Sequence, residues 1–465
     1  MRMTLPLISL ALFAAGSCHI KKDRLSDAYR FDKNGWIYVH LSGDPEDIGY
    51  QHGYLLANEI DDNLKSTEMM LTHETGKDWI FYRTAARTML WPHIDSEYRA
   101  EMQGIVEGMS AKGKTCDVYD IVALNANIEL SQYYVPYLAN LAKPHSDLNK
   151  APGNCSAFIA TGSYTTDGKI AMGHNDWTNY VQGERWNVVA DITPTKGYHI
   201  FMDMMPGFIH SGDDFAVNGN GVLITETTIT QFNGFDTTQV AEFVRARKAE
   251  QYASNIDDFV KIMSDGNNGG YANDWLVGDM NKNEIARVEL GLKHVKVWRT
   301  NDGVYFGSNF ASDSSVIADE TTFKTNDTTT SPNTRKRRWE ELMAQNKGKI
   351  NDSTGRAMEA DNLNAMSGTK EDTRCVIAGS VDTDPKGCPE WDWAPYYPGG
   401  TVQGKLTTAD LAKSFSFWAH MGNPSGKDFL AAPFLAAHKE YDWMSPYLKD
   451  MKAYPWTLFK AGDRQ

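Results

Sequence analysis

One cysteine, Cys155, stands where the sequence changes from loop-like to strand-like. It lies in Asn154-Cys155-Ser156, and a second polar group follows in Gly173–Trp177, which reads Gly-His-Asn-Asp-Trp. A thiol is the side chain most easily activated as a nucleophile near neutral pH, and a histidine or carboxylate beside it can act as its base. Most buried cysteines only fill space, so packing is the alternative explanation. The chemistry to test is nucleophilic catalysis by the Cys155 thiol.

A predicted β-hairpin brings these residues together. Residues 155–161 and 170–175 both alternate like strands, and the Thr-Asp-Gly-Lys between them is a turn signal. Because the second strand of a hairpin ends beside the start of the first, the polar residues 174–176 would lie near the Cys155 thiol.

The chain before the hairpin is predicted to be mainly helical. Residues 35–41 alternate like a strand, and Asp44-Pro45 then supplies a capping carboxylate and a proline at the first helical position. Gly49 and Gly53 share one face of this helix, which predicts close packing against a neighbour. Further helical periodicity covers Ile60–Leu71, Phe81–Leu90, Tyr98–Met109 and Val118–Leu130. A Pro-, Gly- and Asn-containing loop, Lys143–Asn154, ends this part.

The chain after the hairpin alternates strands with helices. Strands are predicted at Trp186–Ile192, Tyr198–Met204, Phe215–Val217, Val222–Thr228, Trp275–Asp279, Ile285–Leu290 and Val295–Trp298. Helices are predicted at Gln239–Gln251, Ile256–Met263, Thr334–Gln345 and Thr408–His420. This pattern predicts an α+β fold with mainly antiparallel sheets.

The order and spacing of several blocks resemble the phospholipase B-like family. The blocks are Cys155–Ala157, Gly173–Trp177, Ser211–Phe215, Gly221–Thr228 and Asn273–Trp275. The segment Gly43–Leu56 also resembles the related penicillin acyltransferase group. Both groups are N-terminal-nucleophile (Ntn) hydrolases, so the resemblance implies a four-layer αββα core with a helical N-terminal segment.

The resemblance further implies that the chain cuts itself between Asn154 and Cys155. The expected parts are a signal peptide at 1–18, a helical segment at 19–154 that is released but retained, and a catalytic region at 155–465. The new α-amino group, with a pKa of about 7.7–8.0 when unperturbed, would act as the base for the thiol on the same residue.

The resemblance also implies roles for other residues. Asn273 would donate its side-chain amide to the oxyanion. Asp176 would orient the new amino terminus, and His174 competes with it for that role. Arg335 would pair with carboxylates at the site, or Arg338 would take its place. Asn175 and Trp177 are expected to contact the substrate.

Other polar groups are predicted to be structural. Asp213, Asp214 and Glu226 could be paired carboxylates for acid–base catalysis. The family resemblance implies instead that Asp213-Asp214 is a turn before a strand, so we favour structure over catalysis for all three. The histidines are scattered, and no Cys-x-x-Cys or His-Glu-x-x-His pattern occurs, so we assign no metal and no cofactor.

The N-terminus indicates export. Arg2 precedes the apolar stretch Leu5–Ala15 and small residues before Cys18, which is typical of a signal peptide. Ala15–Cys18 also resembles a bacterial lipobox, although Ala15 replaces the usual large aliphatic residue, so Cys18 could anchor the chain to a membrane. A periplasmic, outer-membrane-anchored or extracellular location is expected. Disulfides would then be permitted, and Cys375 and Cys388 are close enough in sequence to close a short loop.

The net charge of −14 disfavours a nucleic-acid partner. The leading hypothesis is a self-processed cysteine Ntn hydrolase acting on a small-molecule or lipid acyl amide or ester. The first alternative is an inactive exported protein that binds lipid or acyl groups on the same fold. The second is a cysteine enzyme of another fold, in which Cys155 never becomes N-terminal. The sequence leaves the oligomeric state open.

Overall fold

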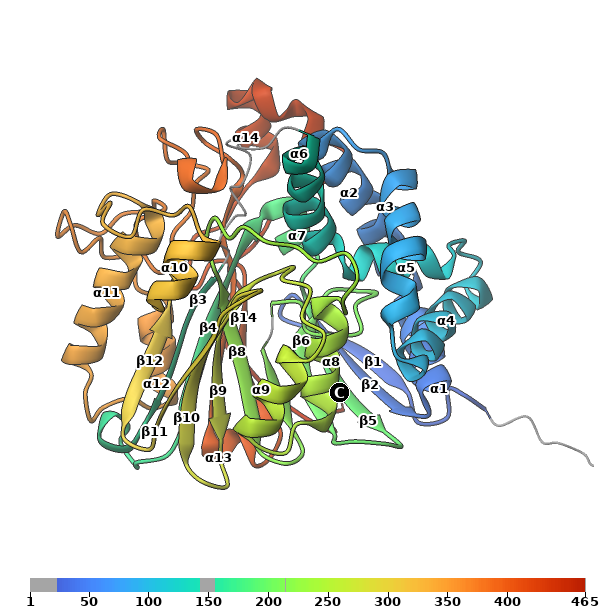
Figure 1. The fold of residues 1–465 in the computed structure, drawn as a ribbon, viewed down its shortest axis with the longest axis horizontal. Helices are drawn as coiled ribbons and strands as arrows, with labels where there is room; N and C mark the ends of the chain where they lie inside the picture. Colours follow the sequence, from blue (N-terminus) through green and yellow to red (C-terminus); the bar gives the residue numbers. More distant parts are fainter. Residues whose placement is uncertain (1–22, 143–154, 214, 465) are drawn as a thin grey trace, which may run out of the picture.

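The computed structural model describes residues 23–142, 155–213 and 215–464, which form two β-sheets with helices around them (Figure 1). The larger sheet has nine strands in the order β1-β2-β5-β6-β7-β8-β9-β10-β11. Its strands are β1 (Tyr29–Lys33), β2 (Trp36–Gly43), β5 (Val188–Pro194), β6 (Ile200–Met204), β7 (Ala216–Asn218), β8 (Val222–Thr228), β9 (Asn273–Asp279), β10 (Glu284–Leu290) and β11 (Val295–Thr300).

The smaller sheet has six strands in the order β12-β3-β4-β13-β14-β15. Its strands are β3 (Cys155–Thr161), β4 (Ala171–Asn179), β12 (Gly303–Gly307), β13 (Gly399–Thr408), β14 (Ser416–Met421) and β15 (Thr457–Lys460). The strand pairs in both sheets are antiparallel except β2 with β5, which is parallel. The predicted α+β class with mainly antiparallel sheets is confirmed.

The helices lie around these sheets. They are α1 (Pro45–Leu55), α2 (Ala57–Thr75), α3 (Trp79–Ala85), α4 (Ser96–Ala111), α5 (Val118–Asn125), α6 (Val135–Ala142), α7 (Tyr180–Gly183), α8 (Glu242–Tyr252), α9 (Ile256–Ser264), α10 (Ser314–Glu320), α11 (Ser331–Gln345), α12 (Asp352–Glu359), α13 (Ala409–Ala412) and α14 (Ala431–Ala437). Short 3-10 or π segments are η1 (Ala86–Leu90), η2 (Trp91–His93), η3 (Glu129–Tyr134), η4 (Gly162–Tyr164), η5 (Pro389–Trp391) and η6 (Lys439–Met444).

The two sheets pack face to face through an apolar layer. Ala157 and Ile159 of β3 contribute to this layer from one sheet, and Phe201 of β6 and Leu223 of β8 contribute from the other. The opposite face of β3 carries Phe158, which packs against Trp339 of α11. This alternation follows from the two-residue period of a strand, and it places Cys155 on the face that looks toward the second sheet.

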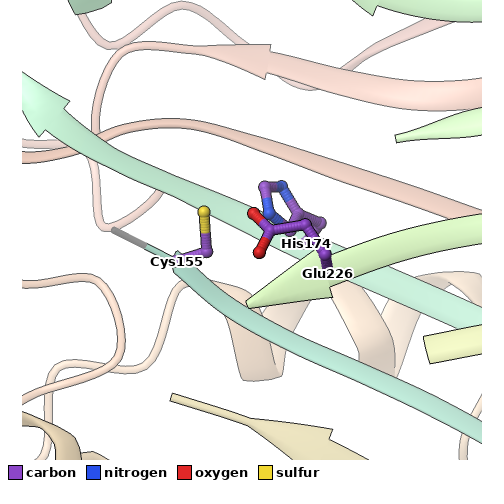
Figure 2. Close-up of side chains that lie close together, drawn as sticks. All are labelled: Cys155, His174 and Glu226. Atoms are coloured by element: carbon purple, nitrogen blue, oxygen red, sulfur yellow. The ribbon is translucent and has the colours of Figure 1, made fainter. Parts of the chain in front are cut away.

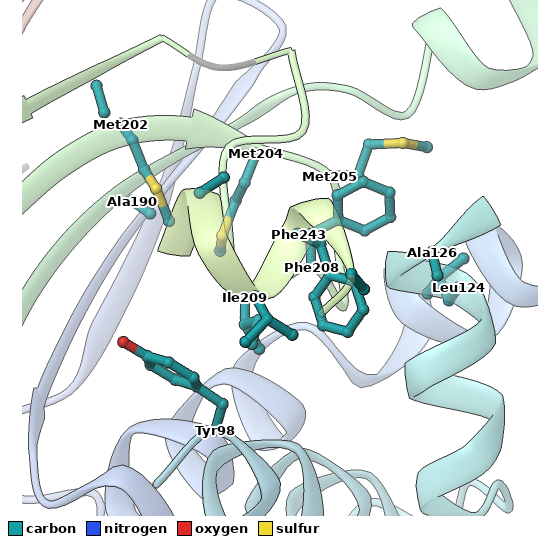
Figure 3. Close-up of a cluster of buried hydrophobic side chains, with 14 of the residues drawn as sticks. Tyr98, Leu124, Ala126, Ala190, Met202, Met204, Met205, Phe208, Ile209 and Phe243 are labelled. Carbon is teal, nitrogen blue, oxygen red and sulfur yellow. The ribbon is translucent and has the colours of Figure 1, made fainter. Parts of the chain in front are cut away.

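The outer face of the nine-stranded sheet is covered by the N-terminal helices together with α8 and α9 (Figure 1). Figure 3 shows part of this interface, where Met202 and Met204 of β6 lie near Phe243 of α8 and Tyr98 of α4. Helices α11 and α12 cover the outer face of the six-stranded sheet. The layer order is therefore helices, sheet, sheet, helices.

The predicted close packing at Gly49 and Gly53 is confirmed, since α1 lies directly against α4. A Cβ atom added to Gly49 would lie 1.8 Å from the carbonyl oxygen of Glu101, and one added to Gly53 would lie 2.0 Å from that of Ile105. Helix α1 starts at Pro45 as predicted, but the Asp44 carboxylate accepts a hydrogen bond from Thr195 rather than capping the helix.

We expect Gly53→Ala to destabilise the protein by at least about 1–3 kcal/mol, because the methyl group meets backbone that cannot move aside cheaply. Urea unfolding of the variant and the parent would measure the change. Ser110→Ala, at an exposed position of α4, is the control and should change the free energy of unfolding by less than about 0.5 kcal/mol. Equal stability of the two variants would contradict the packing described here.

The prediction of a helix over Thr408–His420 is wrong. Thr408 ends strand β13, only Ala409–Ala412 are helical, and Ser416–Met421 form β14. The Ser-Phe-Trp-Ala-His-Met run is buried between β13 and β15, so a strand satisfies its backbone hydrogen bonds and a helix would not. The prediction also missed β1, β12, β13 and β15. The N-terminal part is not purely helical, because β1 and β2 join the larger sheet.

Several expectations fall outside the described residues, namely the signal peptide, Cys18, the loop Lys143–Asn154 and Asp214. Cys375 and Cys388 are free thiols in the structure. A search of the described residues found no helix that is both long and apolar enough to cross a bilayer.

Candidate functional site

The Cys155 side chain lies between the two sheets, at the start of β3 (Figure 2). The predicted hairpin is confirmed: Cys155 is paired with Asp176 and Ala157 with His174 across β3 and β4. Figure 2 shows His174 and Glu226 beside the thiol, and one ligand atom from each of the three residues lies within 4.8 Å of the others. Two strands of one sheet and one strand of the other therefore converge on the sulfur.

Glu226, expected to be structural, has its carboxyl group at the thiol. Tyr271 donates its hydroxyl hydrogen bond to Oε1 at 3.2 Å. The Asn273 side-chain amide is oriented so that its nitrogen and its oxygen each face a suitable hydrogen-bond partner. In this orientation the nitrogen donates to Glu226 Oε2 at 3.0 Å and to the Ala272 carbonyl at 3.2 Å. Burial raises the pKa of Glu226 well above its usual range. Asn273, the predicted oxyanion donor, thus lies at the site and is held by Glu226.

The backbone N–H of Cys155 is bound by Asn309, which the sequence reasoning missed. This N–H donates to Asn309 Oδ1 at 3.3 Å, and the Asn309 amide donates to the Thr228 carbonyl at 3.0 Å. Asn309 has a φ of 72°, in the left-handed region that few residues other than glycine adopt. Backbone strain of this kind is frequent at functional sites, because the surrounding structure must hold it in place.

Arg335 of α11 fixes the same corner of the site. It is fully buried and donates to the Cys155 carbonyl oxygen at 2.7 Å, to Ser156 Oγ at 2.8 Å and to Asn309 Oδ1 at 2.8 Å. A further bond, 2.9 Å long, runs to Ser331 Oγ. The hydrogen bonds we find for Arg335 go to neutral oxygens and not to carboxylates, and burial lowers its pKa to about 10. Arg338 instead pairs with Asp361 and Glu341.

A buried charge network lies on the other side of His174. Lys405 of β13 is opposite His174 in the strand register, and its ammonium group binds Asp203 Oδ2 at 2.9 Å as well as Asp213. Burial alone would lower the pKa of Lys405, but Asp203 and Asp213 raise it overall. The Asp213 carboxylate lies 3.9 Å from His174 Nδ1. Lys405 therefore stays charged in the interior.

The predicted base candidates Asp176 and His174 are both buried on the face of β4 that looks toward the second sheet. Burial is the main cause of the high pKa of Asp176, and Asp213 adds to it. Burial lowers the pKa of His174 well below its usual value, and Lys405 lowers it further. Neither ring nitrogen of His174 has a hydrogen-bond partner among the described residues. His174 is therefore a neutral imidazole, and its low pKa makes it a weak base.

The two predicted substrate contacts point away from the thiol. Asn175 donates to the Glu359 carbonyl at 2.7 Å, and Trp177 donates to the Ile377 carbonyl at 3.2 Å. Both follow the odd-numbered face of β4, which looks toward the outer layer of the six-stranded sheet. Trp177 touches the site indirectly, since the Arg335 guanidinium lies 4.8 Å from the centre of its ring.

Comparison with known proteins places this arrangement in a family. A family model described as phospholipase B matches residues 50–321, which is more than half of the 465 residues. The chain belongs to the phospholipase B family. The matched range contains Cys155, His174, Glu226, Asn273 and Asn309 and ends before α11, so the family model does not reach the arginine that binds the Cys155 carbonyl.

Relatives in this family are distant. An uncharacterized protein of Archaeoglobus fulgidus is 26% identical over 287 residues, which cover 59% of this chain and 47% of the relative. Phospholipase B-like protein G of Dictyostelium discoideum is 34% identical over 137 residues, covering 27% and 22%. Phospholipase B-like 1 of Bos taurus is 25% identical over 309 residues, covering 56% and 55%. The chain spans about half the length, or less, of these curated relatives.

Proposed function

We propose that the protein is a cysteine Ntn hydrolase that cuts its own chain before Cys155 and then cleaves an acyl amide or an acyl ester. The observation that carries this proposal is the placement of both groups of Cys155. Its thiol faces Glu226 and His174, and its backbone nitrogen faces the Asn309 amide oxygen. The helix–sheet–sheet–helix layers support a four-layer αββα fold, and membership in the phospholipase B family supports hydrolysis.

The state of the thiol explains why a base is needed. Burial raises the pKa of Cys155 well above its usual range, and the nearby carboxyl groups of Glu226 and Asp176 raise it further. A neutral thiol is a poor nucleophile, so its proton must leave as the sulfur attacks. In the processed chain the α-amino group of Cys155 accepts this proton.

The reaction then has two stages. Sulfur forms a bond to the acyl carbon, and the oxyanion accepts the Asn273 hydrogen that otherwise goes to the Ala272 carbonyl. The bond to the amine or alcohol then breaks as that leaving group receives the proton. Water next attacks the thioester, gives its proton to the amine base and releases the carboxylic acid, which restores the thiol. Glu226 positions Asn273 in this scheme, and Arg335 positions Cys155 and Asn309.

One observation favours a second mechanism. His174 is a neutral imidazole with no hydrogen-bond partner among the described residues, and it lies next to the thiol. It would be the proton acceptor in a chain that is never cut, as in an ordinary cysteine hydrolase, although burial and Lys405 lower its pKa and oppose this transfer. The same Cys-His-Glu set is of a kind that zinc also accepts, although neither mechanism uses a metal.

The N-terminal sequences and intact masses of the purified protein decide between these mechanisms. We expect two associated chains, one of which begins at Cys155. A single uncut chain that hydrolyses acyl substrates would replace the proposal with the His174 mechanism. A single chain that binds acyl compounds without turnover would support the inactive alternative. Fractionation of the producing cells would test the expected export.

Asn309 should control the pH dependence of the reaction. In Asn309→Asp a carboxylate faces the α-amino group, favours its protonated form and raises its pKa by about one unit or more. Because the reaction needs the free amine, the acidic limb of the kcat/KM profile should move to higher pH by the same amount. The control Asn309→Gly suits the positive φ and removes the amide, so it should lower kcat without moving that limb upward. An unchanged limb in Asn309→Asp would refute this role.

A further inference from the structure

A cavity of about 810 Å³ lies beyond the end of β4. Its walls come from the end of α2, the η3–α6 segment, the end of β4 with α7, and the residues after η5. Two lining residues lie close to the residues of the site. Thr178 lines the cavity two residues beyond Asp176 on the same face of β4, and Trp391 lines it while its ring centre lies 5.3 Å from the Arg335 guanidinium. Its volume is within the usual range for small-molecule sites, about 300–1,000 Å³.

The cavity has two chemically different sides. Helix α6 contributes small and aliphatic side chains, including Val135, Leu138 and Ala139. Trp391, Trp393 and Tyr397 line the cavity as well, and they form an aromatic group. Within it, Trp391 and Trp393 meet edge to face at 5.3 Å, and Trp393 and Tyr397 stack at 4.7 Å. The aliphatic side suits an acyl chain, and aromatic faces attract cations.

The charges around the aromatic group also favour a cation. Glu74 lines the cavity and accepts a hydrogen bond from the Tyr397 hydroxyl at 2.9 Å. Burial raises the pKa of Glu74 to about 7, so this side chain is mainly charged above neutral pH. Asp392 lies between the two tryptophans in sequence. Among the described lining residues Lys77 is the one lysine or arginine. A site for a phosphate or sulfate group usually provides several cationic donors, and this lining does not.

We propose that this cavity binds an amphiphile with a cationic ammonium group, which lies against Trp393 and Tyr397 while the acyl chain lies along α6. The ammonium group is attracted by the aromatic faces and by the Glu74 and Asp392 carboxylates. This inference deepens the proposed function, because it names the substrate class as an acyl amide or ester with a positively charged amine or choline-like part. It rests on that function only in treating the bound amphiphile as the substrate.

Three probes with the same chain and different head groups test the proposal: decyltrimethylammonium, decyl sulfate and decyl maltoside. None contains an acyl bond, so the protein can be used as purified, whether or not it has been cut. Titration calorimetry below the micelle concentrations should show the ammonium probe binding at least about tenfold more tightly than the other two. Comparing the affinities of decylammonium and decyltrimethylammonium would show whether the cavity prefers a primary amine or a choline-like group.

Variants locate the binding. Glu74→Gln should lower the affinity for the ammonium probe several-fold and leave the affinity for the maltoside unchanged. Trp393→Leu should remove the preference for the cationic probe. Ala139→Trp should lower the affinity for all three probes, because the larger side chain fills the apolar side of the cavity. Trp298→Leu, on β11 and outside the cavity, should change none of them.

Equal binding of the three head groups, or tighter binding of the sulfate, would overturn the cationic assignment. Binding that Ala139→Trp and Trp393→Leu leave intact would overturn the cavity as its location, and so would a lack of binding by every probe. These outcomes are independent of whether the chain is cut before Cys155, so a failure here is distinguishable from a failure of the proposed function.

Discussion

Cys155→Ala should remain a single uncut chain and lose hydrolysis by at least about 10⁴-fold, the scale seen when an enzyme loses its nucleophile. The same sulfur is proposed to start the self-cleavage and to attack the substrate, so both activities should disappear together. Denaturing electrophoresis with mass spectrometry measures the first, and release of a carboxylic acid from an acyl substrate measures the second. Cys155→Ser, which keeps a weaker nucleophile, should still cut slowly.

The matched control is Cys116→Ala. Cys116 is half-buried among the N-terminal helices, and burial raises the pKa of its thiol to about 12, so it should contribute nothing to either activity. Normal processing of Cys155→Ala would show that another protease cuts the chain, and the intramolecular mechanism would be abandoned. Processing and activity lost in Cys116→Ala would point to misfolding rather than chemistry.

Lys405→Met should destabilise the fold by about 3–5 kcal/mol, the usual cost of removing one partner of a buried ion pair. Methionine keeps most of the volume, but it leaves the Asp203 and Asp213 carboxyl groups without their cation in a site where neither residue is exposed. Chemical unfolding measures the loss. Lys169→Met is the control, since Lys169 pairs with Asp410 on the surface and should contribute only about 0–1 kcal/mol.

The pH dependence of this effect has a definite sign. The folded-state pKa of Lys405 is raised above the value of about 10.4 expected in the unfolded chain. The stabilisation by Lys405 is therefore fully present below about pH 10 and is lost as the pH rises through the higher folded value. The stability difference between the parent and Lys405→Met should be constant from neutral pH to about 10 and shrink above it. A difference that grows above pH 10 would contradict the buried ion pair.

The sequence predicted those parts of the fold that depend on local pattern. The hairpin of β3 and β4 follows from alternation around a turn, and the start of α1 follows from Pro45 at its first position. The helix prediction for Thr408–His420 failed because the apolar residues of this segment fit a helical period as well as a buried strand. Pairing with β13 and β15 decides in favour of the strand.

Local pattern predicted the site only where its residues are close in sequence, and the distant residues Asn273 and Arg335 were predicted through the family resemblance. Cys155, His174 and Asp176 share one hairpin, so local spacing brought them together. Lys405 and Asn309 reach the site through pairings between distant strands and loops, and no local signal marks them. Glu226 was assigned to structure because a strand pattern cannot show which buried carboxyl group faces the thiol.

The strand order has a consequence for the two products of a cut before Cys155. Strand β2 is hydrogen-bonded to β5 across the larger sheet, and the Tyr38 hydroxyl donates to Asp191 at 2.7 Å. The residues before the cut therefore form part of one continuous sheet with the residues after it. The processed molecule would behave as a non-covalent heterodimer that does not dissociate on dilution. Once the two chains are unfolded, they must associate again in order to refold, so the refolding rate would depend on their concentration.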